Sequence, residues 1–158
     1  MTSFDTNPAA TLKTEQEALL ALTGLLEQEQ QLLIAANIER IALLTEPKAQ
    51  AAVHMAELAT KRYEALTATG HEGSEAGMKT WLSSQAATAA HNKDWNDLLT
   101  LAEAAKELNR VNGTLINKQL ARNQQALDVL QHGTEHGNPV YGPAGQKTSK
   151  SIGRHIIA

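Results

Sequence analysis

The chain has 158 residues, of which 42% are hydrophobic and 20% charged, and its net charge is −3. This is the composition of an ordinary soluble protein of one domain. No concentrated basic face is present to attract nucleic acid, and the absence of cysteine excludes disulfide bonds and thiolate sites. Aromatic residues make up only 3% of the chain, whereas alanine, leucine, glutamine and glutamate are abundant. Because good helix formers dominate, we expect an all-α protein.

The first amphipathic segment runs from Asn7 to about Thr45. Asn7 can cap a helix, and Pro8 suits the first helical position. The apolar residues that follow recur at steps of three, four or seven. They are Leu12, Leu19, Leu22, Leu26, Leu33, Ile34, Ile38, Ile41 and Leu44. This spacing predicts one long helix with a single apolar stripe.

Pro47 predicts a break after that helix, because proline lacks an N–H donor and its ring clashes with the preceding turn. A second helix can then begin at Thr45 or Glu46, with an apolar stripe that includes Ala52, and end in the glycine-containing loop 69–73. The short connection favours an antiparallel hairpin of the two helices. A single kinked helix is the competing geometry.

Two more helices are predicted after this loop. Ser74 can cap a short helix that carries Met78, Trp81, Leu82 and Ala86 and that ends or bends near His91. A long helix is then expected from about residue 93 to residue 131. Its apolar residues are Leu98, Leu101, Ala105, Leu108, Leu115, Ile116, Leu120, Leu127 and Leu130. The whole pattern predicts an elongated antiparallel helical hairpin or coiled-coil bundle with a short third helix and a long C-terminal helix.

Residues 133–158 differ in composition from the rest of the chain. They hold five of the ten glycines and two of the four prolines, and they show no helical periodicity. We therefore predict a helical bundle domain over residues 1–132 and a flexible tail over residues 133–158. The N-terminal residues do not resemble a signal peptide, and no apolar run is long enough to span a bilayer, so a cytoplasmic protein without membrane insertion is expected.

No motif for catalysis or metal binding is recognisable. The sequence has no glycine-rich phosphate loop and no nucleophile elbow. His132 and His136 have the spacing of two metal ligands on one helix face, but Gly133 and Gly137 argue against a helix there, so solvated histidines are favoured. We therefore expect no metal, no cofactor and no enzymatic activity. A bundle enzyme with a metal or cofactor is the least favoured alternative.

Polar residues interrupt the stripe of the long helix. Asn109 and Asn112 occupy heptad positions where apolar residues are expected, and Gly113 follows them. In one interpretation, asparagine fixes the register against a neighbouring helix and Gly113 allows close approach. In the other, this face is held for a partner. The first is favoured, because buried asparagine in helical pairs is well attested.

The tail contains one aromatic motif, which runs from Val140 to Gly145. Tyr141 is either a chance residue in a Gly-Pro turn or a short docking site, in which tyrosine offers apolar area and a hydroxyl group. The residues Ile152, Ile156 and Ile157 could likewise form a one-turn apolar face on binding. Ordering the tail has an entropic cost, so such docking is expected to be weak or transient.

Taken together, these motifs resemble the FlgN-type flagellar type III export chaperones. In the predicted hairpin the matching residues are Glu29, Leu33, Asn37, Ile41, Leu44, Lys48, Leu58, Arg62, Leu66 and Gly70. In the C-terminal half they are Asn109, Asn112, Gly113, Leu115, Ile116, Leu127, Leu130, Tyr141, Gly142, Gly145 and Gln146. The Asn-Asn-Gly and Tyr-Gly motifs are the more specific part of the resemblance.

The resemblance implies a cytoplasmic helical protein that binds the hook-associated (hook–filament junction) proteins and shields their terminal helices until assembly. It also implies delivery of these clients to the export gate, with Tyr141 at the position of the family's gate-docking tyrosine. The physical pattern agrees, because an apolar stripe larger than its own hairpin can cover must be buried against something else.

We predict two partner-binding surfaces. The substrate-facing residues are Asn109, Val111, Asn112, Gly113, Leu115, Ile116, Leu120 and Leu127. The export-gate and tail residues are Val140, Tyr141, Gly142, Gly145, Ile152, Ile156 and Ile157. A monomer or weak homodimer is expected. The alternative is a structural coiled-coil protein that only self-associates and has no client.

Overall fold

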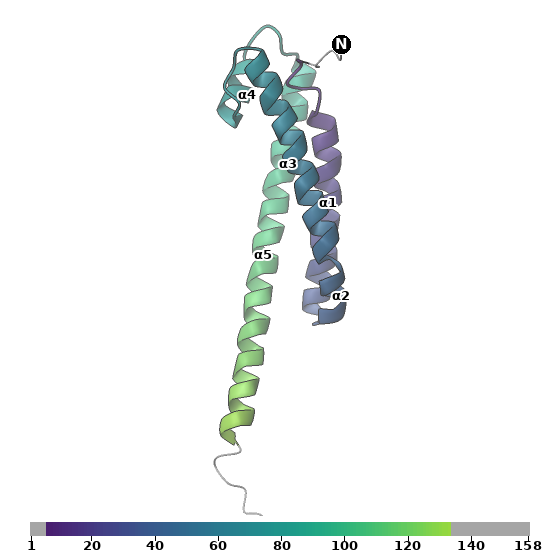
Figure 1. Ribbon diagram of the computed structural model, residues 1–158, viewed down its shortest axis with the longest axis vertical. Helices are drawn as coiled ribbons and strands as arrows, with labels where there is room; N and C mark the ends of the chain where they lie inside the picture. The colour runs from purple at the N-terminus through teal and green to yellow at the C-terminus, as the bar shows by residue number, and fades with distance from the viewer. Residues whose placement is uncertain (1–5, 134–158) are drawn as a thin grey trace, which may run out of the picture. The chain divides into compact units, whose positions relative to one another are not determined.

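The computed structural model describes residues 6–133, and every regular element in this range is a helix (Figure 1). The predicted all-α class is therefore confirmed. The helices are α1 (Leu12–Ile34), α2 (Ile38–Leu43), α3 (Thr45–Ala68), α4 (Glu75–Leu82) and α5 (Ala89–Gly133). The chain divides into two compact units, Met1–Gln119 and Leu120–Ala158, so α5 contributes to both. The predicted tail beyond residue 133 lies outside the described residues, and the predicted domain boundary at residue 132 stays a prediction.

Helices α1 and α3 lie side by side and run antiparallel, as the hairpin pattern predicted (Figure 1). Two ion pairs connect them. Arg62 Nε lies 3.1 Å from Glu15 Oε2, and Lys48 pairs with Glu29. The acidic residues of the two pairs are as far apart along α1 as the basic residues are along α3. One antiparallel register therefore accounts for both ion pairs.

The first helix is shorter at both ends than the sequence predicted. The chain from Asn7 forms a turn, in which Ala9 N–H donates to Asn7 Oδ1 at 3.0 Å, and α1 begins only at Leu12. The helix also ends at Ile34, although the apolar periodicity continues beyond it. Around the break some apolar side chains of the predicted stripe are exposed, whereas Ile41 and Leu44 beyond it are half-buried. Leu33 is 2% exposed, whereas Ile34 is 67% and Ile38 66% exposed.

The break between α1 and α2 is a Schellman motif built without glycine. Ala36 N–H donates to Leu33 O at 3.1 Å, and Asn37 N–H donates to Leu32 O at 2.9 Å, which is the bonding pattern of this motif. Ala36 has a φ of 52°, in the left-handed region where glycine is usual because a Cβ crowds the backbone. Asn37 then caps α2, since its side chain accepts the Arg40 N–H at 3.2 Å. Local hydrogen bonds therefore determine where the chain turns.

Pro47 follows a helix boundary, as predicted, because α2 ends at Leu43, four residues before it, and α3 begins at Thr45. It lies in the first turn of α3, which begins at Thr45 directly after Leu44. A residue in a first turn has no intrahelical acceptor for its N–H, so proline forfeits no hydrogen bond there. The predicted start at Thr45 is confirmed, but Ala52 of the predicted stripe is exposed. The residues that α3 buries are Leu58, Arg62, Ala65 and Leu66.

Helix α4 begins as predicted but is shorter. Ser74 caps it by accepting the Gly77 N–H at 3.1 Å. Glycine is required at residue 77, because a Cβ there would lie 1.7 Å from the carbonyl oxygen of Glu72. The helix ends at Leu82 rather than near residue 91, and Ala86 is exposed beyond it.

Helix α5 is separate from α4 and begins at Ala89, four residues earlier than predicted. Thr88 and His91 cap it reciprocally, since His91 N–H donates to Thr88 Oγ1 and Thr88 N–H donates to His91 Nδ1, both at 3.2 Å. The His91 ring also lies 5.5 Å from the Trp81 ring, measured between centroids. The start of α5 is therefore joined to the end of α4.

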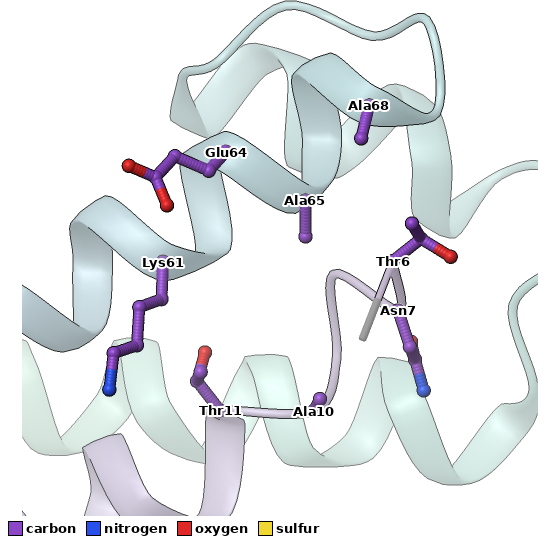
Figure 2. Close-up of a pocket in the computed structure, with 8 residues that line it drawn as sticks. All are labelled: Thr6, Asn7, Ala10, Thr11, Lys61, Glu64, Ala65 and Ala68. Carbon is purple, nitrogen blue, oxygen red and sulfur yellow. The ribbon is translucent and has the colours of Figure 1, made fainter. Parts of the chain in front are cut away.

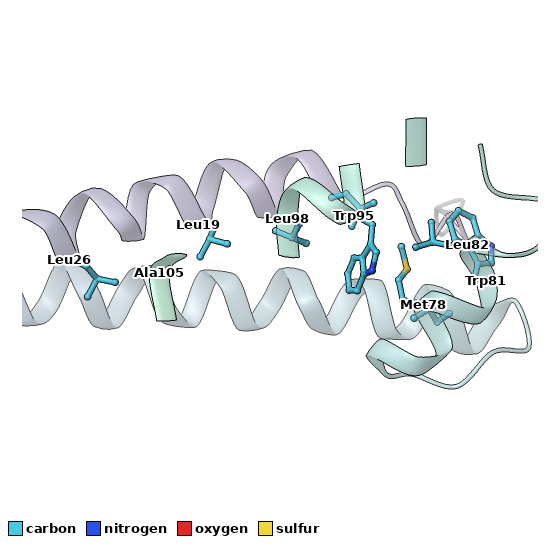
Figure 3. Close-up of a cluster of buried hydrophobic side chains, with 10 residues drawn as sticks. Leu19, Leu26, Met78, Trp81, Leu82, Trp95, Leu98 and Ala105 are labelled. Carbon is cyan, nitrogen blue, oxygen red and sulfur yellow. The ribbon is translucent and has the colours of Figure 1, made fainter. Parts of the chain in front are cut away.

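The buried core joins side chains from α1, α3, α4 and α5 in one cluster (Figure 3). Its members are Leu12, Leu19, Leu26, Leu66, Met78, Trp81, Leu82, Trp95, Leu98 and Ala105. Burying one large apolar side chain is worth about 1.5–3 kcal/mol, so this cluster supplies much of the stability of the first unit.

The strained residue at the first break yields a test. Replacing Ala36 by Gly should raise the free energy of unfolding by about 0.5–1 kcal/mol, because glycine adopts positive φ without Cβ crowding. Urea titration followed by circular dichroism measures the change. The control is Ala35→Gly, at a residue with a φ of −79°, which should lower the stability instead. Destabilisation by both variants would contradict the strain at Ala36.

Candidate functional site

Helix α5 is held against α1 by polar side chains. Asn112 is 1% exposed, and its Nδ2 donates to Leu26 O at 2.8 Å and to Glu29 Oε1 at 3.1 Å. Farther along, the Gln119 side chain donates to Leu33 O. Each of the two carbonyl contacts joins residues that are 86 apart in the sequence. A constant separation means that α5 runs parallel to α1, in a single register.

Asn112 was predicted as a partner-binding residue, but the structure buries it among the chain's own helices. The structural interpretation of the asparagine seam therefore fits this position. Both partners of its Nδ2 are acceptors, which fixes the orientation of the amide, and its Oδ1 has no hydrogen-bond partner among the described residues. Glu29 also accepts from Lys48, so one carboxylate connects α1, α3 and α5.

The neighbouring residues of the motif have different surroundings. Asn109 is exposed. A Cβ added at Gly113 would meet nothing within 4 Å, so the predicted reason for this glycine, close helix approach, is wrong. Val111 and Leu115 are half-buried, and Ile116 is 37% exposed.

A second buried polar contact, between Glu15 and Arg62, was not predicted. The guanidinium donates from Nε and Nη2 to both carboxylate oxygens, at 3.1–3.3 Å. It also lies 4.9 Å from the centroids of the Tyr63 and Trp95 rings, one on α3 and one on α5. The sequence did indicate that these two carboxylates would be buried, because Glu15 and Glu29 occupy positions of the apolar stripe of α1, between its leucines.

The last part of α5 exposes several apolar side chains. No side chain of residues 120–133 is buried. Leu120 is 60% and Leu127 52% exposed, and Val129 is 70% exposed. Leu120 and Leu127 are seven residues apart and share one helix face, whereas Val129 lies on the opposite side of α5. Of the apolar residues predicted to face a substrate, these two leucines are the most accessible.

A cleft of about 510 Å³ lies between the N-terminal turn and the end of α3 (Figure 2). It is lined by Thr6, Asn7, Ala10, Thr11, Lys61, Glu64, Ala65 and Ala68. These side chains are mostly small, and they include no histidine or cysteine. Within residues 6–133 no group of three or more histidine, cysteine, aspartate or glutamate side chains is arranged to hold a metal ion. The cleft therefore offers no recognisable catalytic arrangement.

Three groups in solvated ion pairs on α5 have shifted pKa values. The hydrogen bond from Arg110 lowers the pKa of the Glu107 carboxyl group, and the same bond raises the pKa of Arg110. The hydrogen bond to Asp97 likewise raises the pKa of Lys93. These are ordinary surface ion pairs along a helix. In the described part of the chain, no helix has the length and apolarity needed to cross a membrane.

The fold and the site define a class of all-helical protein: an antiparallel hairpin, a short helix packed on it, and a long helix whose last part exposes an apolar face. The family model described as FlgN protein matches residues 1–149 of the chain. The Flagella synthesis protein FlgN of Yersinia enterocolitica is 34% identical over 148 residues, which cover 92% of each chain. That of Proteus mirabilis is 30% identical over 154 residues, covering 92% of this chain and 94% of its own.

The chain therefore belongs to the FlgN family, as its motifs indicated. No solved structure matches it.

The buried amide of Asn112 can be tested against its exposed neighbour. Asn112→Ala should lower the free energy of unfolding by about 1–3 kcal/mol, because Glu29 and Leu26 O lose a buried donor. Asn109→Ala should change it by less than about 0.5 kcal/mol, because this side chain is exposed. Urea titration of both variants gives the comparison. Equal effects would show that the amide does not hold α5 against α1.

Proposed function

We propose that this protein is a cytoplasmic export chaperone that shields the terminal helices of hook-associated junction proteins and delivers them to the type III export gate. Its relatives in Yersinia and Proteus are named as flagella synthesis proteins, which supports a flagellar role. The clients and the gate come from the resemblance to the FlgN-type chaperones. The physical support is the exposed apolar face of α5.

The observation that carries the proposal is the pair of leucines at 120 and 127. Both are more than half exposed, on one face of a helix that has no buried side chain from residue 120 to residue 133. Burying a leucine stabilises a contact by about 1.5–3 kcal/mol, so a partner helix lying along this face gains free energy from each. An amphipathic client helix with leucine-size residues at the same spacing fits this mode of binding.

The other predicted substrate-facing residues take different places in the proposal. Val111, Leu115 and Ile116 are partly accessible on α5 and remain proposed contacts. Asn109 and Gly113 remain proposed as polar and small neighbours of that surface. Asn112 is left out, because its side chain is already engaged with α1.

The proposed contact with the export gate involves residues outside the described range. Tyr141 is its principal residue, accompanied by Val140, Gly142 and Gly145. The residues Ile152, Ile156 and Ile157 are proposed as a second apolar segment that contacts a partner. Because the two surfaces consist of different residues, client binding and gate binding should be separable by substitution.

Client binding is tested by reversing the polarity of the proposed face. Leu120→Asp combined with Leu127→Asp should weaken binding of a purified junction protein at least about 100-fold, because two buried leucine contacts are lost. Isothermal titration calorimetry measures the affinity. The control Val129→Asp places the same charge on the opposite side of α5 and should retain binding. If both proteins bind the client equally well, the proposed face is not the client site.

Gate binding is tested at the tail. Tyr141→Ala should leave the affinity for the junction protein unchanged but weaken capture of the cytoplasmic domain of the export gate, because the ring supplies most of the apolar area of this motif. Tyr141→Phe keeps the ring and should bind more strongly than the alanine variant. Unchanged gate capture by Tyr141→Ala would rule out this assignment.

The competing function is structural self-association without a client. Sedimentation of the full chain distinguishes the two. A stable dimer that protects the Leu120–Leu127 face would support self-association, whereas a monomer that binds junction protein supports the chaperone.

A further inference from the structure

The first unit carries a second apolar surface, at the corner between α1 and α2. A cleft of about 440 Å³ lies there, and we call it the α2 cleft. It is lined by Gln28, Gln31, Leu32, Arg40, Leu43 and Leu44. Leu43 is 73% exposed, the largest exposed fraction among the exposed large apolar side chains of residues 6–133. Ile34 and Ile38 flank the same break and are also about two-thirds exposed, at 67% and 66%.

This corner has a fixed geometry rather than a frayed one. The hydrogen bonds of the Schellman motif and the Asn37 cap define the path of the chain. Gln119 from α5 binds the carbonyl of Leu33, and the Lys48–Glu29 pair joins the start of α3 to α1. The left-handed backbone at Ala36 is strained, and such strain often persists where surrounding structure holds it for a function. The exposed apolar residues are therefore presented on a rigid support.

The charge at the cleft indicates the chemistry of its occupant. None of the ion pairs in residues 6–133 involves Arg40, although it lines the cleft. The other nearby cation, Lys48, is already paired with Glu29. A guanidinium group matches a carboxylate through two parallel hydrogen bonds. A carboxylate next to leucine-size side chains would complement both features of this site.

We propose that the α2 cleft binds an acidic amphipathic helix of a partner protein, whose apolar side chains contact Leu32 and Leu43 and whose carboxylate pairs with Arg40. This is a helix-in-groove mode of recognition, with the two glutamines as polar neighbours. It does not rest on the proposed client site, because the residues lie on α1 and α2 and not on the last part of α5.

A second copy of the chain is a poorer occupant. A stable protein interface needs about 800 Å² from each partner, and a cleft lined by six residues provides only part of such an area. A single partner helix, bound reversibly, suits this size. Charge selectivity then follows from Arg40, because it is the one charged residue among the six that line the cleft.

The test uses the full chain and two synthetic helical peptides of about 18 residues. Both carry leucine at i, i+3, i+4 and i+7, and they differ only in having glutamate or lysine beside the leucines. Titration of the glutamate peptide into the ¹⁵N-labelled protein should shift the NMR signals of the backbone amides of residues 28–44. The glutamate peptide should bind at least about tenfold more tightly than the lysine peptide.

Three variants make the result specific. Arg40→Glu should reverse the preference, so that the lysine peptide binds more tightly than the glutamate peptide. Leu43→Asp should lower the affinity for the glutamate peptide at least about tenfold. Leu127→Asp should leave binding at the cleft unchanged. Since the replaced side chains are exposed, unaltered circular dichroism is expected and confirms folding.

The proposal is overturned if neither peptide shifts residues 28–44, if both bind equally, or if the signals change only with protein concentration, as a second copy would cause. None of these results would affect the client site on α5.

Discussion

The carboxylate of Glu29 is the point on which the arrangement of three helices depends. It accepts hydrogen bonds from Lys48 on α3 and Asn112 on α5, and it is itself almost fully buried on α1. The helices around it are rich in alanine and poor in aromatic residues, so apolar packing alone would tolerate a shift of one helix along another. A shift would leave a buried carboxylate and amide without partners. Polar contacts therefore define the register, and apolar contacts supply the stability.

In this register the last contact of α5 with α1 lies near the end of α1. Gln119 binds the carbonyl of Leu33, and α1 ends one residue later at Ile34. Helix α5 continues to Gly133 with the same apolar spacing, but none of its side chains beyond Gln119 is buried in the described range. The leucines at 120 and 127 are therefore exposed within the second unit.

The sequence allowed the class and several local features to be predicted. The Ser74 cap, the buried residues of α4 and the start of α3 at Thr45 were all readable, because each depends on residues close together in the chain. The break at Ala36 was not readable, since alanine is a strong helix former and no glycine marks the turn. Pro47 marked the boundary between α2 and α3, because proline is compatible with the first turn of a helix but not with its interior.

The polar contacts of the site were only partly predictable. Asn112 stood out in the heptad, and both the structural and the functional interpretations were open until its partners were known. Glu15 occupies a stripe position as well, but nothing in the sequence pairs it with Arg62 on another helix, forty-seven residues away. Which buried charges meet is a property of the three-dimensional register. The exposed leucines were predictable as apolar stripe residues, whereas their exposure was not.

The positions of the two tryptophans determine which part of the molecule intrinsic fluorescence reports on. Trp81 and Trp95 are both in the buried cluster of the first unit, and the Trp95 ring lies against the Arg62 guanidinium. Residues 120–158 contain no tryptophan. Indole emission consequently reports the integrity of the packed helices and is blind to local events at the end of α5. A fluorophore introduced there would follow binding at a wavelength of its own, without disturbing the intrinsic signal of folding.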